Sequence, residues 1–268
     1  MQPQNIAMKI LDLFSGIGGF AIAADWAGFN TTQFVEIDPN AQKILRHHYP
    51  DIPIHDDVQT FKGDRHKFDI VAAGFPCTGT SFAGLQTGLA HPESSLFYEI
   101  LRIAKNVEPK FIIIENPIGL IHNGLREVLA LLRMGGYSSE IISVTAAQLG
   151  AGHKRERLFI VSYPHVGSES PRIEVCGASE VRALVQKARR YSNWLQVKSG
   201  GDGDDNGLSC NMAFGDRNVG FSKEKILVEA GLKGRLTVRI LAGRSVTPQQ
   251  ALIPFLWIKD FIERQESE

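Results

Sequence analysis

Short apolar segments rich in β-forming residues alternate with segments of helical periodicity between residues 8 and 162. This alternation is typical of a mostly parallel sheet whose connecting helices cover both of its faces. We count five or more such strand–helix units and therefore expect a doubly wound α/β fold. The expected strands are residues 8–14, 33–37, 68–72, 110–114, 140–144 and 158–161, and the expected helices are residues 20–27, 40–48, 94–106 and 123–133.

The periodicity fades after Pro164, and the glycine- and aspartate-rich residues 199–207 are typical of a flexible connection. A helical pattern returns only at the end, where Pro248 fits a first helical turn and apolar residues continue to about Arg264. We therefore predict three regions. They are a large α/β domain over residues 1–163, a small region over residues 164–234, and a C-terminal segment over residues 235–268 whose helix packs back on the first domain.

The chain of 268 residues is 43% apolar, which is enough to bury a sizeable core. It has no apolar run of about 18 residues and no signal-peptide pattern at its start, so we expect a soluble, cytoplasmic protein. The cysteines Cys77, Cys176 and Cys210 are too few and too scattered to indicate a disulfide framework or a zinc site. We accordingly expect no metal.

Basic and acidic residues balance, with 29 of each, so the overall charge does not indicate a polyanionic partner. Between residues 151 and 200, however, Lys and Arg exceed Glu. Such a segment is either a solvated face or a phosphate-binding surface, and charge alone does not separate the two.

A glycine-rich turn, Gly16-Ile17-Gly18-Gly19, lies between the first expected strand and helix. Glycines let the backbone approach a ligand closely, and the helix N-terminus offers free N–H groups. Glu36 follows Gly16 by twenty residues at the end of the second strand, where a carboxylate can accept hydrogen bonds from ribose hydroxyls. Asp57-Val58 suits a contact to an adenine edge. The pattern favours a cofactor that contains adenosine.

Cys77 follows Gly74-Phe75-Pro76 directly after an apolar strand. A free cysteine is most often a small buried apolar residue. Here the proline and the flanking glycines predict a tight loop at the carboxyl edge of the sheet, where open α/β folds bind ligands. A nucleophilic thiol needs a nearby positive charge or base, and Lys154-Arg155-Glu156-Arg157 offers candidates.

Glu115 ends the very apolar segment 111–114. Burial disfavours a charged carboxylate and raises its pKa, so a glutamate in this place can hold or give a proton. The alternative is a glutamate that caps the following turn.

The glycine turn, the Cys77 loop, Glu115 and the basic segment follow one another along the chain in the order typical of the DNA (cytosine-5) methyltransferase family, and the chain resembles that family. The similarity is continuous over residues 8–162 and weaker over residues 243–250. The matching motifs are the cofactor motif at residues 12–20, the nucleophile loop at 74–81, the Glu-Asn motif at 115–116, and the Arg-x-Arg strand entry at 155–160.

The resemblance implies a Rossmann-like, S-adenosylmethionine-dependent methyltransferase fold that methylates a flipped-out cytosine in duplex DNA. Cys77 would add to C6 of the ring, Glu115 would hold N3 and supply a proton, and Arg157 would contact the base or the Cys77 loop, with Arg155 beside it. A covalent adduct is needed because C5 of cytosine alone is too weak a nucleophile. The first region would then be the catalytic and cofactor-binding domain, and residues 164–234 a small target-recognition lobe.

The resemblance also implies ligand-binding residues and partners. It suggests a monomer of a prokaryotic or viral restriction–modification system that binds double-stranded DNA near the nucleoid, without membrane or metal. The implied S-adenosyl-L-methionine site comprises Phe14, Ser15, Gly16, Gly18, Gly19, Glu36, Ile37, Asp57, Val58, Pro76 and Leu96, and the implied DNA-binding residues are Ser81, Arg155, Arg189 and Arg190.

Two positions depart from the family pattern. His153 replaces the Gln of Gln-x-Arg-x-Arg, and Arg244 replaces the Asn of a late Gly-Asn-x-Val motif. These changes leave open a DNA-binding homologue with impaired turnover. A tRNA cytosine-5 methyltransferase also stays open, because nothing in the nucleophile loop excludes it. A nicotinamide oxidoreductase with a reactive thiol is a more distant alternative, because a glycine turn with an acidic residue would suit either cofactor.

Overall fold

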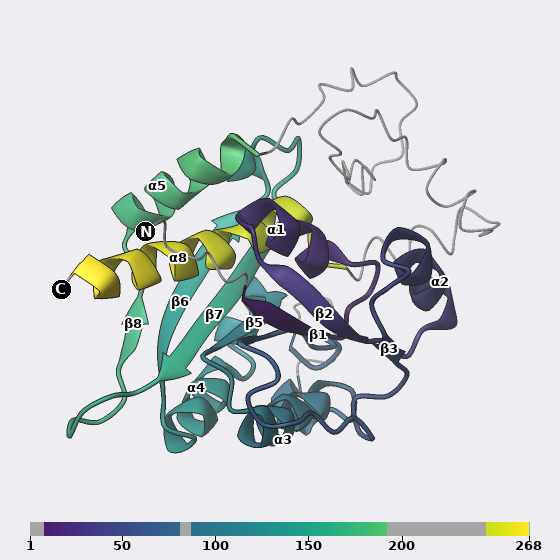
Figure 1. Cartoon of the computed structure of the whole chain (residues 1–268). Coiled ribbons are helices and arrows are strands. Elements are labelled where there is room, and N and C mark those ends of the chain that lie inside the picture. Colours follow the sequence, from purple (N-terminus) through teal and green to yellow (C-terminus); the bar gives the residue numbers. More distant parts are fainter. Residues whose placement is uncertain (1–7, 81–86, 192–244, 268) are drawn as a thin grey trace, which may run out of the picture.

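The computed structural model describes residues 8–80, 87–191 and 245–267. These residues build one eight-stranded sheet with the strand order β3-β2-β1-β4-β5-β7-β6-β8, covered by helices on both faces (Figure 1). The strands are β1 (Lys9–Leu13), β2 (Asn30–Val35), β3 (Ile54–His55), β4 (Ile70–Gly74), β5 (Phe111–Pro117), β6 (Tyr137–Thr145), β7 (Glu156–Pro164) and β8 (Ile173–Val175).

The pairing of the strands confirms the expected doubly wound, mostly parallel sheet. Every pair is parallel except the two that β7 makes with β5 and β6. The chain moves outward from β1 through β2 to β3 and then returns to β4 on the other side of β1. The carboxyl ends of β1 and β4 therefore flank the point where the winding reverses, which is where open α/β sheets bind ligands.

The helices divide into two layers, and each layer covers its own apolar core. One core gathers side chains of α1, α5 and α8 and the other those of α3 and α4, in agreement with the arrangement in Figure 1. None of the helices in the described ranges is long and apolar enough to cross a membrane. The helices are α1 (Gly19–Ala27), α2 (Pro39–His48), α3 (Phe97–Val107), α4 (Leu125–Met134), α5 (Ala178–Arg189) and α8 (Pro248–Ser267), with short 3₁₀ helices η1 (Gly88–Ala90), η2 (Ser94–Leu96), η3 (Ile118–Ile121) and η4 (Ala147–Leu149).

The C-terminal helix α8 packs against α1 and α5, as a helix returning to the first domain should. Its middle, from Ala251 to Ile258, is buried on all sides. A helix that is apolar all round is stable only inside a core. Residues 245–267 are therefore part of the α/β unit in three dimensions, although they follow it at the far end of the chain.

The expectation that regular structure fades after Pro164 is wrong for β8 and α5. Helix α5 buries Val181, Leu184, Val185 and Ala188, a spacing of one helical face. The signal was weak because only four of the twelve residues form this face, and alanines, polar and charged residues make up the rest. The sheet thus includes part of the region 164–234, and the remainder of the proposed lobe, with Trp194, lies outside the described residues.

Candidate active site

The loop that carries Cys77 leaves the carboxyl end of β4 and is fixed by its own hydrogen bonds. Thr80 N–H donates to the carbonyl of Cys77 at 3.0 Å. The hydroxyl of Ser94 accepts from Gly79 N–H at 3.0 Å and donates to the carbonyl of Pro76 at 3.1 Å. Cys77 itself is half-buried rather than sealed in the core. The loop therefore holds the thiol in a defined place that a substrate can still reach.

Asn116 in β5 connects this loop to the sheet. Its side-chain amide donates to the carbonyl of Phe75 at 3.1 Å, and its side-chain oxygen accepts from the Thr80 hydroxyl at 2.6 Å. All of these groups are buried, so an unmade bond would leave an unpaired polar atom. The Asn of the Glu-Asn motif thus connects the Cys77 loop to β5.

Glu115 lies on the same side of the sheet as the start of that loop. It pairs in register with Gly74, the last residue of β4. A Cβ added to Gly74 would stand 3.1 Å from Glu115 Oε2, so the carboxylate lies directly against the strand end that leads to Cys77. On its other side, Glu115 Oε1 is 2.7 Å from Arg157 Nε at the start of β7.

Burial dominates the electrostatics of the carboxylate. It raises the pKa of Glu115, while the positive charges of Arg157 and Arg155 partly oppose the rise. Burial and the neighbouring Arg157 lower the pKa of Arg155 to about 10, whereas Glu115 and Cys77 act in the opposite direction. Arg155 therefore stays cationic at neutral pH within reach of the charge of Cys77. The four predicted catalytic residues share one edge of the sheet.

The glycine turn after β1 has the tight backbone that its sequence predicts. Gly16 and Gly18 adopt positive φ angles of 55° and 88°, and Phe14 before them also has a positive φ of 55°. Helix α1 starts at Gly19 without a side-chain cap, which leaves its first N–H groups available to a ligand. The conformation is that of a cradle for a polar or anionic group.

Glu36 joins this turn to the end of β2. One carboxylate oxygen accepts from Gly16 N–H at 2.6 Å and the other from Asp38 N–H at 2.8 Å. Ser15 reinforces the connection, since its hydroxyl donates to the carbonyl of Asp12 at 2.7 Å and accepts from Val35 N–H at 3.2 Å. Burial raises the pKa of Glu36, and the backbone N–H donors counteract it.

The chain after residue 244 packs closely on the same turn. A Cβ on Gly19 would fall 2.3 Å from the carbonyl oxygen of Val246, and one on Gly16 would fall 2.8 Å from Ser245 Oγ. Both distances are too short for real atoms. Glycine is therefore required at these two places by a neighbour that is more than 220 residues away in sequence.

The remaining predicted cofactor residues lie in other segments of the α/β unit. Ile37 follows β2 and is 72% exposed, Asp57 caps a turn by accepting from Gln59 N–H at 2.9 Å, and Val58 is buried beside it. Pro76 belongs to the Cys77 loop and Leu96 ends η2. All lie in segments that follow β2, β3 or β4.

Arg102 was not predicted, although it fixes the segment that contains Asp57 and Val58. Its guanidinium donates to the carbonyls of Phe61 and Val58 at 3.0 and 2.8 Å. Gln250, near the start of α8, is a second such residue. Its amide donates to the carbonyls of Val144 and Arg155, both at 2.9 Å, and so holds the Arg-x-Arg turn. A polar glutamine near the start of an otherwise apolar helix was the only signal for it in the sequence.

The predicted DNA-binding residues do not form one group. Arg189 ends α5 and its Nε donates to the carbonyl of Gln148 at 2.9 Å, while Arg190 beside it is exposed. Arg155 is directed inward, and its Nη2 donates to the carbonyl of Ser245 at 2.6 Å. Ser81 lies outside the described residues.

Residues 8–181 match the model of the C-5 cytosine-specific DNA methylase family, and this range contains every motif described above except the segment around Ser245. The chain belongs to this family. The match covers the α/β domain, including β8 and the first turn of α5.

Relatives in this family include Type II methyltransferases of bacteria and of a virus. Type II methyltransferase M.CviJI of Paramecium bursaria Chlorella virus IL3A is 37% identical over 59% of this chain and 43% of its own length. Type II methyltransferase M1.HphI of Haemophilus parahaemolyticus is 34% identical over 79% of this chain and 66% of its own length. The chain spans about half the length of most curated relatives it matches.

Solved structures with a similar fold carry lower sequence identity. The Dnmt2 methyltransferase of S. pombe superposes with a TM-score of 0.53 at 21% identity, over 68% of this chain and 55% of that one. The methyltransferase EhMeth of Entamoeba histolytica gives 0.51 at 17% identity, over 63% and 56% of the two chains. These similarities establish the fold.

Proposed function

We propose that the protein transfers a methyl group from S-adenosylmethionine to C5 of a flipped cytosine in double-stranded DNA. Family membership supports the reaction class. The observation that carries the proposal is the position of Glu115. Its carboxylate lies against the end of β4 that leads to Cys77, and the same carboxylate forms an ion pair with Arg157 at 2.7 Å. A nucleophile, an acid and a cation thus meet at one edge.

In this proposal Cys77 is the nucleophile. Its thiolate bonds to C6 of the cytosine ring, which turns C5 into an enamine-like carbon that can accept a methyl group. Loss of the C5 proton and release of the thiolate then restore the ring. Arg155 favours the thiolate, because a negative charge on Cys77 interacts favourably with this guanidinium.

Glu115 is the acid that polarises the ring at N3. Because burial raises its pKa, the carboxyl keeps a proton to higher pH than an exposed glutamate does. It can therefore donate to N3 while the thiolate adds at C6. Arg157 holds the carboxyl in place through the ion pair and prevents it from rotating away.

The residues at the glycine turn suit S-adenosylmethionine, which supplies a methyl group activated on a sulfonium. The uncapped start of α1 offers N–H groups to a carboxylate, and Glu36 keeps lone pairs for ribose hydroxyls after accepting its two backbone bonds. Asp12 supports this fit, since both of its buried carboxylate oxygens lack a partner among the described residues. Exposed Ile37 offers apolar surface for a base.

The proposed partner is duplex DNA, bound by a monomer without a metal in the transfer step. Flipping a base costs a few kcal/mol, which phosphate contacts offset. Arg189 and Arg190 lie beyond the carboxyl end of β6, next to η4, and are suited to such contacts. Target recognition is assigned to the region 164–234.

A methyl-transfer assay tests the proposal. The purified protein and labelled S-adenosylmethionine are incubated with duplex DNA or with tRNA, and with Cys77→Ser as the control. We expect label in DNA, none in tRNA, and none with the variant. DNA that contains 5-fluorocytosine should trap a covalent adduct in the wild type alone. Label in tRNA would redirect the proposal to RNA, and the absence of both label and adduct would indicate a binding protein.

A further inference from the structure

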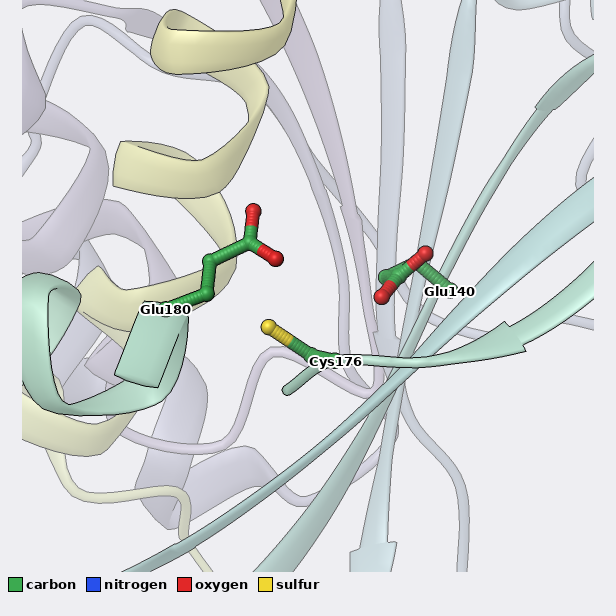
Figure 2. A group of neighbouring side chains, drawn as sticks. All are labelled: Glu140, Cys176 and Glu180. Atoms are coloured by element: carbon green, nitrogen blue, oxygen red, sulfur yellow. The ribbon is translucent and has the colours of Figure 1, made fainter. Parts of the chain in front are cut away.

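Three side chains with metal-binding atoms converge at the β8 edge of the sheet, away from the Cys77 site. They are Glu140 from β6, Cys176 directly after β8, and Glu180 from the first turn of α5 (Figure 2). One ligand atom of each lies within 4.8 Å of those of the other two. Strands β5 and β7 separate this cluster from β4 and its nucleophile loop, so the two sites share no residue.

Glu140 is the member of the cluster that ordinary packing does not explain. It is only 7% exposed, and within the described part of the chain no hydrogen bond or ion pair engages its carboxylate. Figure 2 shows its side chain directed toward Cys176 and Glu180. Buried carboxylates are normally paired, hydrogen-bonded or bound to a metal.

The charges around Glu140 increase the need for a cation. Glu180 faces it and Glu174 lies opposite it in the register of β6 and β8. Arg264 of α8 approaches the cluster, but its Nη1 contacts Glu180 Oε1 at 3.4 Å and its side chain is half exposed. The cluster therefore combines two carboxylates and a thiol with one peripheral guanidinium.

Simpler roles account for the other two members. Cys176 belongs to the apolar core under α5 and α8, and a buried free cysteine commonly does no more than pack. Glu180 lies in the first helical turn, where a carboxylate is favourable for the helix dipole. The Cys176 thiol also makes a hydrogen bond with Glu180. Neither this bond nor the two roles explains why both side chains face a third, buried carboxylate, that of Glu140.

We propose that Glu140, Cys176 and Glu180 bind a zinc ion. Zinc accepts thiolate and carboxylate ligands at about 2.3 and 2.0–2.2 Å in a tetrahedron, which brings ligand atoms to roughly 3.5 Å from one another. The ligand atoms lie within 4.8 Å of one another, so each pair must approach by up to roughly 1.3 Å to reach this geometry. Burial raises the pKa of the Cys176 thiol to about 12, so zinc binds with release of the thiol proton, and the resulting thiolate favours zinc over magnesium or calcium. Water completes the coordination.

The zinc ion would be structural. It would join the edge strand β8 and helix α5 to β6. This proposal departs from the expectation of no metal, which considered cysteines alone. Two of the three ligands are carboxylates. Cys176 and Glu180 follow Glu140 by 36 and 40 residues along the chain, and only the fold brings the three together.

Zinc binding by the full-length protein tests the inference. Metal-free protein is titrated with Zn²⁺ against a chromophoric chelator, and we expect one ion per chain. Cys176→Ser and Glu140→Gln should each lower the affinity at least tenfold. Glu169→Gln removes an exposed carboxylate outside the cluster, and Cys77→Ser and Cys210→Ser remove the other thiols, so these controls should bind as the wild type does.

Cobalt gives a second readout that identifies the sulfur ligand. Co²⁺-loaded wild type should show thiolate-to-cobalt charge-transfer absorption, which Cys176→Ser should lose and Cys77→Ser should keep. Circular dichroism of the metal-free variants checks their folding. If a buried variant unfolds, Glu180→Gln at the partly exposed ligand provides the comparison. Absence of stoichiometric zinc, or wild-type affinity in the ligand variants, would overturn the proposal.

Discussion

Arg155 donates a hydrogen bond to the backbone carbonyl of Ser245 at 2.6 Å, across 90 residues of sequence. The hydroxyl of Ser245 in turn accepts from Ile17 N–H at 3.4 Å in the glycine turn. One residue near the C-terminus thus joins the edge that carries Cys77 and Glu115 to the proposed cofactor cradle. A change at Arg155 should therefore affect both ligands.

Replacement of Arg155 by Ala should lower the rate of methyl transfer about 100-fold or more, because a positive charge beside the reacting thiolate is lost. The affinity for S-adenosylmethionine should fall as well, since Ser245 loses its anchor. Single-turnover kinetics and calorimetric titration measure the two effects. The exposed neighbour Lys154 provides the control, and Lys154→Ala should change neither. A loss of rate with unchanged cofactor affinity would refute the coupling.

The pH dependence of stability should report on Glu115. Its native pKa lies above the ordinary value of 4.5, so between these two values the native state binds more protons than the unfolded state. The free energy of unfolding should therefore fall as the pH rises through this window. Urea unfolding from pH 4 to 8 measures the slope. Glu115→Gln should make the curve flatter in that range, whatever its mean stability, and an unchanged slope would contradict the assignment.

The ionisation of Glu115 should also govern the rate of methyl transfer. If a protonated Glu115 donates to cytosine N3, kcat/KM should decrease as the pH rises through the raised native pKa. Arg157→Gln removes an opposing positive charge, so it should raise the pKa of Glu115 further and move this decrease to higher pH. A profile that Arg157→Gln shifts toward lower pH would be incompatible with this role.

The sequence predicted those parts of the site that follow directly from local pattern. Gly16, Glu36, Cys77 and Glu115 each stand at the carboxyl end of a recognisable apolar strand, and parallel strands bring such ends to one edge. The family resemblance then assigned a role to each of them, and these roles stay predictions. The shared edge itself is a consequence of the fold.

Contacts between distant segments could not be predicted in this way. Gln250 holds the carbonyl of Arg155, and Val246 excludes a side chain at Gly19, but no local pattern links residues so far apart. Helix α5 was missed because the four buried residues that form its apolar face give a weak signal in a helix of only twelve residues. Glu140 was read only as part of a strand, since nothing in the sequence indicates that its carboxylate is buried.

Asn116 should matter through the position of the Cys77 loop. Asn116→Ala removes a donor to Phe75 and an acceptor from Thr80, both buried, so the free energy of unfolding should fall by about 1–3 kcal/mol. The rate of methyl transfer should fall by more than the loss of folding stability alone would produce, because the loop that carries Cys77 becomes mobile. Thr80→Val removes one of the two contacts and should show a smaller effect. Equal losses in the two variants would argue against Asn116 as the connection.

Gly19→Ala tests the close packing between the glycine turn and the C-terminal segment. The added methyl would meet the Val246 carbonyl at 2.3 Å, so the backbone must shift, at a cost of about 1–3 kcal/mol in the free energy of unfolding. Gly152 has open space around its Cα, and Gly152→Ala should stay within about 0.5 kcal/mol of the wild type. Chemical denaturation measures both. A Gly19→Ala protein as stable as Gly152→Ala would show that residues 245–246 do not press on the turn.

Glu36→Gln tests whether Glu36 binds the cofactor or only holds the backbone of the glycine turn. The amide keeps the size of the side chain, but only one of its two ends accepts hydrogen bonds, so either Gly16 N–H or Asp38 N–H loses its acceptor. The turn should loosen, and any ribose hydroxyl should lose a charged acceptor. We expect S-adenosylmethionine affinity to fall at least tenfold by calorimetric titration, with a smaller change in the unfolding midpoint. Glu108→Gln, at an exposed ion pair with Arg65, removes the same charge far from the turn and should bind the cofactor as the wild type does. If both variants bind equally well, Glu36 acts only as a backbone clamp and the cofactor must contact other groups.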